Sequence, residues 1–141
     1  MGRSAKRDHP EPPARLVTFE ATDGVGLSGL LYEPRRGAPA STPALIDSRR
    51  TNLLAGELVK RGIAFFPFNN RGAHLIRRLR SRKARSTRSV HGGMAHELIR
   101  DSVHDIDGAI RFLRARGYRR FYLAGHSTGA NKIAVYDALK P

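Results

Sequence analysis

The fold expected of this chain rests on ten residues, Phe121-Tyr122-Leu123-Ala124-Gly125-His126-Ser127-Thr128-Gly129-Ala130. The first four are apolar, and a short run that is hydrophobic on both faces is typical of a buried strand. The run leads directly into Gly125-x-Ser127-x-Gly129, and the apolar residues that follow it recur at helical spacing. The stretch therefore predicts a strand, a sharp turn and a helix, with Ser127 in the turn.

Strand, turn and helix in this order are the context of a nucleophile elbow, in which a strained turn raises a serine hydroxyl above the sheet. Small residues at 125 and 129 would let the strand and helix backbones approach each other. Ser127 is then the candidate nucleophile, His126 lines the turn, and the backbone N–H of Thr128 is the candidate oxyanion-hole donor. The alternative is a surface loop, since the pentapeptide alone is common; the flanking strand and helix patterns favour the elbow.

The residues from Gly125 to Lys132 resemble the elbow of bacterial serine hydrolases in the α/β-hydrolase superfamily, and the resemblance extends back to about Arg15. It implies an α/β fold: part of an α/β-hydrolase domain, with a mostly parallel sheet, an N-terminal antiparallel hairpin and flanking helices. It also implies hydrolysis of an ester, thioester or amide through an acyl-enzyme, with a small acyl substrate and no cofactor.

Hydrophobic patterning outside the elbow is consistent with such a domain. Two alternating runs, Arg15–Glu20 and Val25–Tyr32, are joined by Asp23-Gly24 and predict a β-hairpin. The remaining elements expected are a strand at Ala44–Ile46, a helix at Thr51–Lys60, a strand at Ile63–Phe68 and a helix at Ala95–Gly117. Strand–helix–strand alternation predicts parallel pairing, with the strands at 44–46, 63–68 and 121–124 adjacent or nearly so.

The tetrapeptide Asn69-Asn70-Arg71-Gly72 follows the strand at 63–68. The family often has Arg-Gly after an acid or asparagine at this place, which modestly supports the resemblance. Our interpretation of the tetrapeptide from sequence is nevertheless a turn.

Residues 75–93 are unusually basic. Seven cations and no acid fall between positions 77 and 88: Arg77, Arg78, Arg80, Arg82, Lys83, Arg85 and Arg88. Like charges at this density repel one another, so we expect an exposed, mobile loop. A patch that binds anions or nucleic acid is the main alternative, and a lid or partner site is a third. No aromatic residue is interleaved to stack on single-stranded bases.

Composition bounds the remaining expectations. The 141 residues suit one domain at 15–141 after a basic, disordered tail at 1–14. The formal net charge of +14 predicts non-specific attraction to polyanions, although a solvated arginine-rich surface explains it as well. No cysteine is present, which fits a cytoplasmic protein and excludes thiolate metal sites. No apolar run is long enough to span a membrane.

The catalytic triad is the main departure from the family. An elbow serine needs a histidine base and an acid, which follow it in the chain in this superfamily. After Ser127 the only acid is Asp137, within the helix pattern, and no histidine follows. Upstream of Ser127, we expect His126 to line the site and His104, next to Asp105, to be a solvated or partly packed helix residue. His9 and His74 have no acid–base partner that the sequence identifies, and His96 lies eight residues before His104. Nor does their spacing predict a metal site.

The second oxyanion donor is also in question. Family members usually carry His-Gly after the third strand, where this chain has Asp47-Ser48-Arg49-Arg50. His91-Gly92-Gly93 is similar to that motif, but it follows the next strand.

Three interpretations remain open at this stage. The chain is the N-terminal portion of a serine hydrolase, weak or inactive as given; or a non-enzymatic basic module that binds nucleic acid or other polyanions; or a fragment that does not fold stably alone. Sequence does not determine the acyl group, the leaving group or the oligomeric state.

Overall fold

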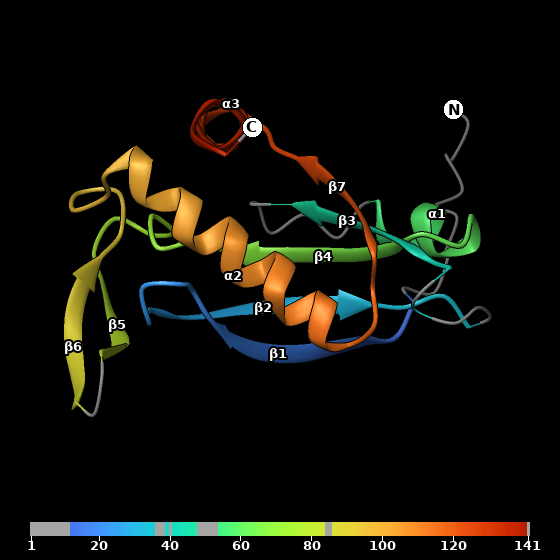
Figure 1. Cartoon of the computed structure of the whole chain (residues 1–141), viewed down its shortest axis with the longest axis horizontal. Coiled ribbons are helices and arrows are strands. Elements are labelled where there is room, and N and C mark those ends of the chain that lie inside the picture. Colours follow the sequence, from blue (N-terminus) through green and yellow to red (C-terminus); the bar gives the residue numbers. More distant parts are fainter. Residues whose placement is uncertain (1–11, 36–38, 40, 48–53, 84–85, 141) are drawn as a thin grey trace, which may run out of the picture.

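A mixed five-stranded sheet forms the centre of the molecule, in the order β1-β2-β4-β3-β7 (Figure 1). The computed structural model describes residues 12–35, 39, 41–47, 54–83 and 86–140. The strands are β1 (Ala14–Glu20), β2 (Gly26–Tyr32), β3 (Pro43–Asp47), β4 (Ala64–Asn69), β5 (Arg77–Lys83), β6 (Ser86–Gly92) and β7 (Arg120–Ala124). The helices are α1 (Ala55–Lys60), the 3₁₀ helix η1 (Ile99–Asp101), α2 (Ser102–Ala115) and α3 (Thr128–Leu139).

The topology confirms the arrangement expected from strand–helix alternation. Strands β4, β3 and β7 are parallel neighbours, and the antiparallel β1–β2 hairpin extends the sheet beyond β4. The carboxyl ends of the three parallel strands therefore meet at one edge of the sheet. Ser127 follows one of these ends, and the turn at Asn70–Gly72 follows another.

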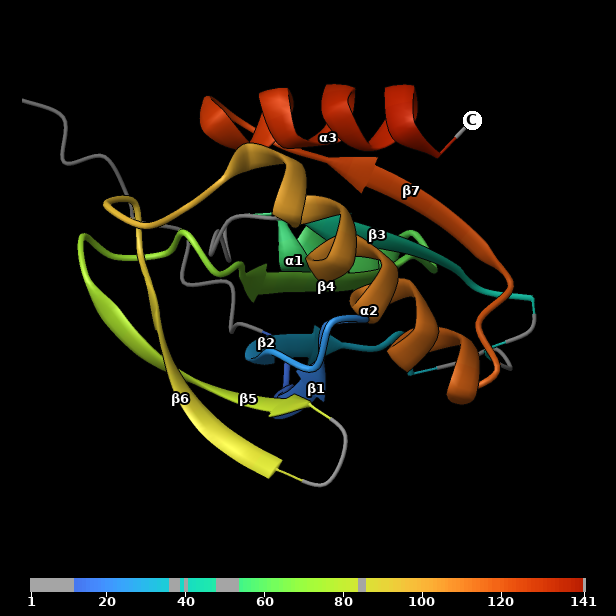
Figure 2. The same cartoon turned by 60° about the vertical axis from the view of Figure 1, so that its left-hand side comes forward.

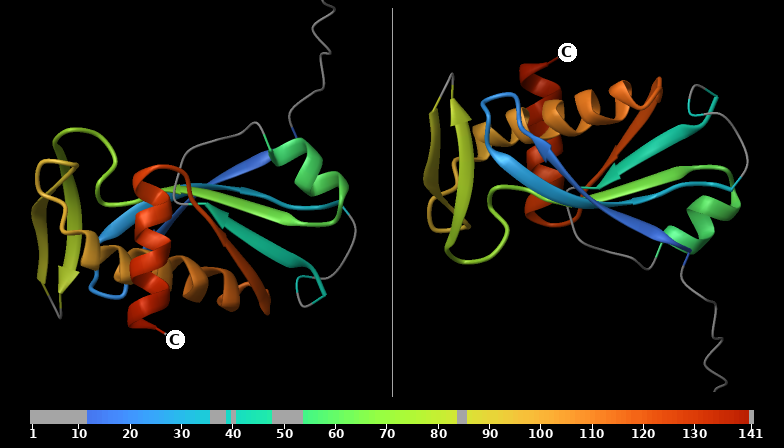
Figure 3. Two further views of the ribbon diagram at one scale, coloured as in Figure 1. Left: turned by 90° about the horizontal axis from the view of Figure 1, so that it is seen from above. Right: turned by 90° about the horizontal axis from the view of Figure 1, so that it is seen from below.

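Both faces of β4 are buried, which explains why its sequence is continuously apolar. Phe66 and Phe68 point to the face covered by α2, where their rings pack with Phe19 and Phe112 at centroid distances of 5.3–6.1 Å. Phe65 points to the opposite face, in the cluster that α1 covers. Figure 3 shows the resulting layers, with α1 on one side of the sheet and α2 and α3 on the other.

Pro67 lies within β4 despite its missing N–H. Pairing with β2 joins Asn69 and Phe68 to Ser28 and Gly29, then resumes only at Phe65 and Tyr32. The antiparallel ladder is thus interrupted opposite Pro67, as expected where a ladder donor is absent. Parallel pairing with β3 continues through Pro67.

The long helix begins later than the sequence predicted. Instead of a helix from Ala95, a loop reaches η1 at Ile99, and α2 starts at Ser102. The N–H groups of Met94 and Ala95 donate to the carbonyls of His74 and Leu75, so they are committed to a neighbouring segment. The helix ends at Ala115, and Gly117 follows with φ +94°, which confirms the predicted stop.

The basic segment 75–93 is not a loop, and this prediction was wrong. Strands β5 and β6 pair in register as an antiparallel hairpin at one end of the molecule (Figures 1 and 2). Leu79 and Ser81 face inward and are buried, whereas Arg78 and Arg80 between and beside them are exposed. Alternation with period two therefore places Arg78, Arg80 and Arg82 on the solvent side, where repulsion between like charges is weak. Arg85 lies outside the described residues.

Candidate functional site

A tight turn connects β7 to α3, and Ser127 occupies its strained position. Ser127 has φ 57° and ψ −125°, and His74 is the only other non-glycine residue with positive φ in the described part of the chain. Such backbone angles cost free energy for a residue with a Cβ atom and cluster at functional sites. The turn is closed by N–H donation from Gly129 to the His126 carbonyl and from Ala130 to the Ser127 carbonyl, each at 3.0 Å.

The two glycines permit a close approach of strand and helix. A Cβ atom at Gly125 would lie 2.5 Å from the carbonyl carbon of Gly129, closer than real Cβ contacts allow. Gly129 is buried, while His126, Ser127 and Thr128 are exposed. Glycine at 125 is thus required by backbone contact.

The amide of Thr128 is not used in a hydrogen bond within the described residues. Thr128 is the first residue of α3, where N–H groups lack intrahelical partners, and its N–H has no acceptor among the described residues. The partial positive charge of a helix N-terminus favours an oxyanion at this position. Ser127 and this amide lie beyond Ala124, which pairs with Asp47 at the carboxyl end of β3.

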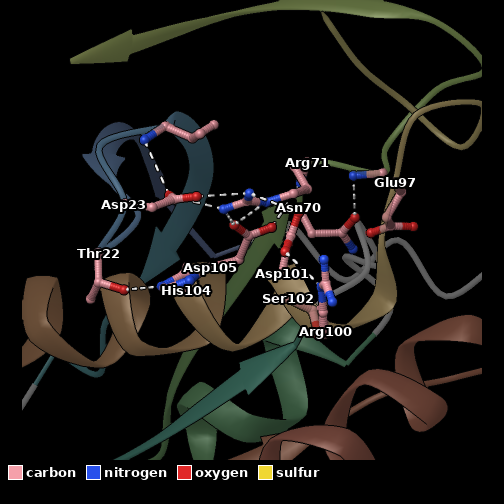
Figure 4. Close-up of polar contacts among 12 residues, drawn as sticks. Thr22, Asp23, Asn70, Arg71, Glu97, Arg100, Asp101, Ser102, His104 and Asp105 are labelled. Atoms are coloured by element: carbon pink, nitrogen blue, oxygen red, sulfur yellow. Dashed lines mark hydrogen bonds and ion pairs between the residues drawn. The ribbon is translucent and has the colours of Figure 1, made fainter. Parts of the chain in front are cut away.

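A cluster of buried and partly buried charged side chains lies beside this edge of the sheet, around Arg71 (Figure 4). The guanidinium of Arg71 donates to Asp105 at 2.7 and 2.9 Å and to Asp23 at 2.9 and 3.0 Å, while its backbone N–H donates to Asp105 at 2.9 Å. Asp101 completes the cluster at 3.7 Å. Bidentate pairing of this kind fixes geometry as well as charge.

The two main acids of the cluster differ in their electrostatics. Burial raises the pKa of Asp105, whose side chain is fully enclosed, and Arg71 opposes this effect. Burial also acts to raise the pKa of Asp23, but the hydrogen bonds and the charge of Arg71, together with the Val25 N–H, outweigh it and hold the pKa of Asp23 below its ordinary value. Burial acts to lower the pKa of Arg71, but its two carboxylate partners, Asp23 and Asp105, outweigh this effect and raise the pKa.

A second buried pair connects α3 to the turn after β4. Lys132, 3% exposed, donates to the side-chain oxygen of Asn70 at 2.9 Å and pairs with Glu97 at 2.5 Å. Asn70 also accepts the Gly72 N–H, and a Cβ atom at Gly72 would lie 2.0 Å from the Glu97 carboxylate. The tetrapeptide Asn69–Gly72, predicted only as a turn, therefore also anchors the helix that follows Ser127.

This cluster was missed because its partners are distant in sequence. Asp23 and Asp105 lie 48 and 34 residues from Arg71. The sequence did contain a signal in Asp101 and Asp105, which are four residues apart, at the end of η1 and in the first turn of α2. In α3 the helix itself was predicted, but its buried face carries Gly129 and Lys132 rather than the apolar Ala130 and Ala134, which are exposed.

The described histidines upstream of Ser127 contact other side chains or are exposed. His104 is exposed on α2, with Nδ1 2.7 Å from the Thr22 hydroxyl oxygen. His96 stacks on His91 with ring centroids 5.4 Å apart. His74 is exposed in the loop after β4, and His9 lies outside the described residues.

The described residues do not identify a second oxyanion-hole donor. Ser48, Arg49 and Arg50 fall outside the described residues. His91 and Gly92 belong to β6, and the Gly93 N–H donates to the Arg71 carbonyl at 2.7 Å, so this amide already has an acceptor.

Two further observations concern metal binding and membrane-spanning helices. Within the described ranges, no three His, Cys, Asp or Glu side chains converge as a metal site would require. The same ranges contain no helix that combines the length and apolar character needed to cross a membrane.

Comparison with known proteins identifies the fold. Neither a protein-family model nor a curated protein sequence matches the chain. Among solved structures, the α/β hydrolase GrgF from Penicillium sp. sh18 aligns with a TM-score of 0.62 at 18% identity, over 91% of this chain and 42% of its own. The chain has an α/β-hydrolase fold. This result confirms the fold class predicted from sequence.

Two esterases show the same similarity. A cold-adapted esterase from an Arctic intertidal metagenomic library aligns with a TM-score of 0.59 at 18% identity, over 99% of this chain and 58% of its own. The esterase domain of a Rhodothermus marinus protein aligns with a TM-score of 0.54 at 20% identity, over 86% and 43%. The chain thus spans roughly half the length of the structures that it matches.

Proposed function

We propose that the chain is the nucleophile-bearing portion of a serine hydrolase, with Ser127 as the nucleophile. The observation that carries the proposal is the strained backbone of Ser127 between two glycines, at the carboxyl end of a parallel strand and the start of a helix. A catalytic role would account for backbone strain at an exposed serine in this position of an α/β-hydrolase fold. A serine in an ordinary surface loop would have no reason to be strained. The esterases among the structural neighbours support the same reaction class.

The reaction would be acyl transfer from a small ester, thioester or amide. The Ser127 hydroxyl oxygen bonds to the carbonyl carbon, and its proton passes to a base. The carbonyl oxygen becomes an oxyanion that the Thr128 N–H stabilises. Collapse of this intermediate breaks the bond to the leaving group, and water then releases the acid from Ser127.

The chain by itself should turn over simple esters slowly. No histidine follows Ser127, and the only acid that does, Asp137, is exposed on α3. Without a general base a serine hydroxyl attacks poorly, and that base typically contributes about 10²–10⁴-fold. Oxyanion stabilisation and binding alone still leave about 10³-fold over water in disabled triads.

Chemical rescue tests the proposal directly. The protein is treated with an activated phosphonate ester at several imidazole concentrations, and the modified residue is located by mass spectrometry. We expect an adduct at Ser127 whose rate of formation rises with imidazole, because the added imidazole replaces the base. Ser127→Ala should lose this adduct, while Ser89→Ala and Thr128→Ala should retain it, since Ser89 is an exposed serine on β6 and Thr128 acts through its backbone.

Two outcomes would overturn the proposal. One is a folded protein that forms no adduct at Ser127 at any imidazole concentration. The other is labelling of Ser127→Ala at the wild-type rate.

A further inference from the structure

The outward face of the β5–β6 hairpin carries a row of arginines. Register places Arg78, Arg80 and Arg82 opposite His91, Ser89 and Thr87, and all six of these residues are exposed. The other face holds Leu79 and Val90, which pack into the core. At about 3.4 Å per residue, the three guanidinium stems are spread along roughly 14 Å of strand.

This face borders a groove. A cavity of about 560 Å³ lies between β5 and the β1–β2 hairpin, and all three arginines line it together with the hydroxyl residues Thr18 and Ser28. Glu20 is the only acid among its lining residues, and it lies 3.4 Å from Arg82. The side chain of Arg82 remains 62% exposed.

The chemistry of the face selects a ligand with repeated anionic groups. Arginine, serine and threonine side chains are the usual partners of phosphate oxygens in nucleic acids. A linear row of cations fits a linear row of phosphates better than it fits a compact anion, and double-stranded DNA carries one charge per about 1.7 Å of axis. The hairpin residues 77–83 and 86–92 include no Phe, Tyr or Trp, so the face offers no stacking platform for the bases of a single strand.

We propose that the outward face of the β5–β6 hairpin binds the phosphate backbone of double-stranded DNA, independently of base sequence. The binding surface consists of Arg78, Arg80 and Arg82 with the polar residues of β6 opposite them. Ser127 belongs neither to the hairpin nor to the residues that line the groove.

Fluorescence anisotropy with a labelled mixed-sequence duplex of about 20 base pairs tests the proposal. Binding is measured from 50 to 200 mM salt for the wild type, for Arg78→Gln/Arg80→Gln/Arg82→Gln, and for the control Arg61→Gln/Arg111→Gln/Arg119→Gln. The control removes the same charge from exposed arginines elsewhere on the surface. Each lost phosphate contact should reduce the salt slope by about 0.9, so the hairpin variant should lose about 2–3 and the control less than 1.

A second variant makes the test independent of the triple substitution. Glu20→Gln removes the anion that competes for Arg82, and we expect it to bind the duplex more tightly than the wild type. Ser127→Ala should bind as the wild type does, which separates this proposal from the hydrolase proposal. Equal loss in the two triple variants, or tighter binding of a single strand of the same length, would overturn it.

Discussion

The backbone angles of Ser127 show that its surroundings hold it in an unfavourable conformation. Most residues avoid a φ of 57° with a ψ of −125°, so the chain must hold Ser127 there against a local cost. The hydrogen bonds at the start of α3 and the contact between Gly125 and Gly129 supply that constraint. Backbone packing, rather than the serine side chain, therefore determines where the hydroxyl lies.

Gly125→Ala should consequently be costly. The new Cβ atom would meet backbone atoms of α3 at 2.5 Å, and backbone cannot rotate away as a side chain can. Overpacking of this kind typically costs about 1–3 kcal/mol of the free energy of unfolding, measured by urea denaturation.

Gly56→Ala is the matched control. Gly56 lies within α1, where a Cβ atom would meet nothing closer than Pro12 at 3.9 Å. Alanine in a helix interior is favoured over glycine by about 0.5–1 kcal/mol, so this variant should be as stable as the wild type or more stable. An equal loss of stability in both variants would contradict the contact argument.

At the scale of elements, the position of α3 depends on one buried lysine. Lys132 reaches both Glu97 before η1 and Asn70 after β4, so it joins the elbow helix to two other segments. A buried cation is costly unless it is paired, and here the partners come from loops that the sequence did not associate.

Lys132→Met should destabilise the protein by about 3–5 kcal/mol, because it leaves the enclosed Glu97 carboxylate without its cation. Adding Glu97→Gln to this variant removes the unpaired charge and should recover part of the loss. Urea denaturation of both single variants, the double variant and the wild type forms the double-mutant cycle. Additive effects would show that the two side chains do not interact.

The elements themselves were mostly predictable from period and punctuation. Strands with one clear alternation or one continuous apolar run, such as β1, β2 and β4, were identified because the order of apolar and polar residues within each strand indicates which of its faces is buried. The β5–β6 hairpin was missed because its charge density outweighed the alternation of Leu79 and Ser81 with arginine. The predicted start of the long helix was wrong because the N–H groups of Met94 and Ala95 donate to the carbonyls of His74 and Leu75 instead of joining a helix.

The site was predictable only in its local part. Gly125, Ser127 and Gly129 are close in sequence, so their pattern predicted the turn. The partners of Arg71 and Lys132 come from four separate segments, and only the folded topology brings these together. The roles proposed for Ser127 and Thr128 in catalysis remain predictions.

At the scale of the whole molecule, β7 has a consequence for solution behaviour. It is the last strand of the described sheet, and all five of its residues pair with β3 on one side only. Tyr122 on this strand is 53% exposed, and Arg120 is its only charged residue. A strand edge with so little charge can serve as a template for strand addition by another copy of the chain.

Self-association should therefore rise with protein concentration, and Tyr122→Lys should suppress it by placing a charge on the open edge. Leu139→Lys is the control, because Leu139 is similarly exposed, at 59%, but lies on α3. Sedimentation velocity at increasing concentration compares the two variants with the wild type. If Leu139→Lys suppresses association equally, the aggregation hazard belongs to exposed apolar surface in general and not to the edge of β7.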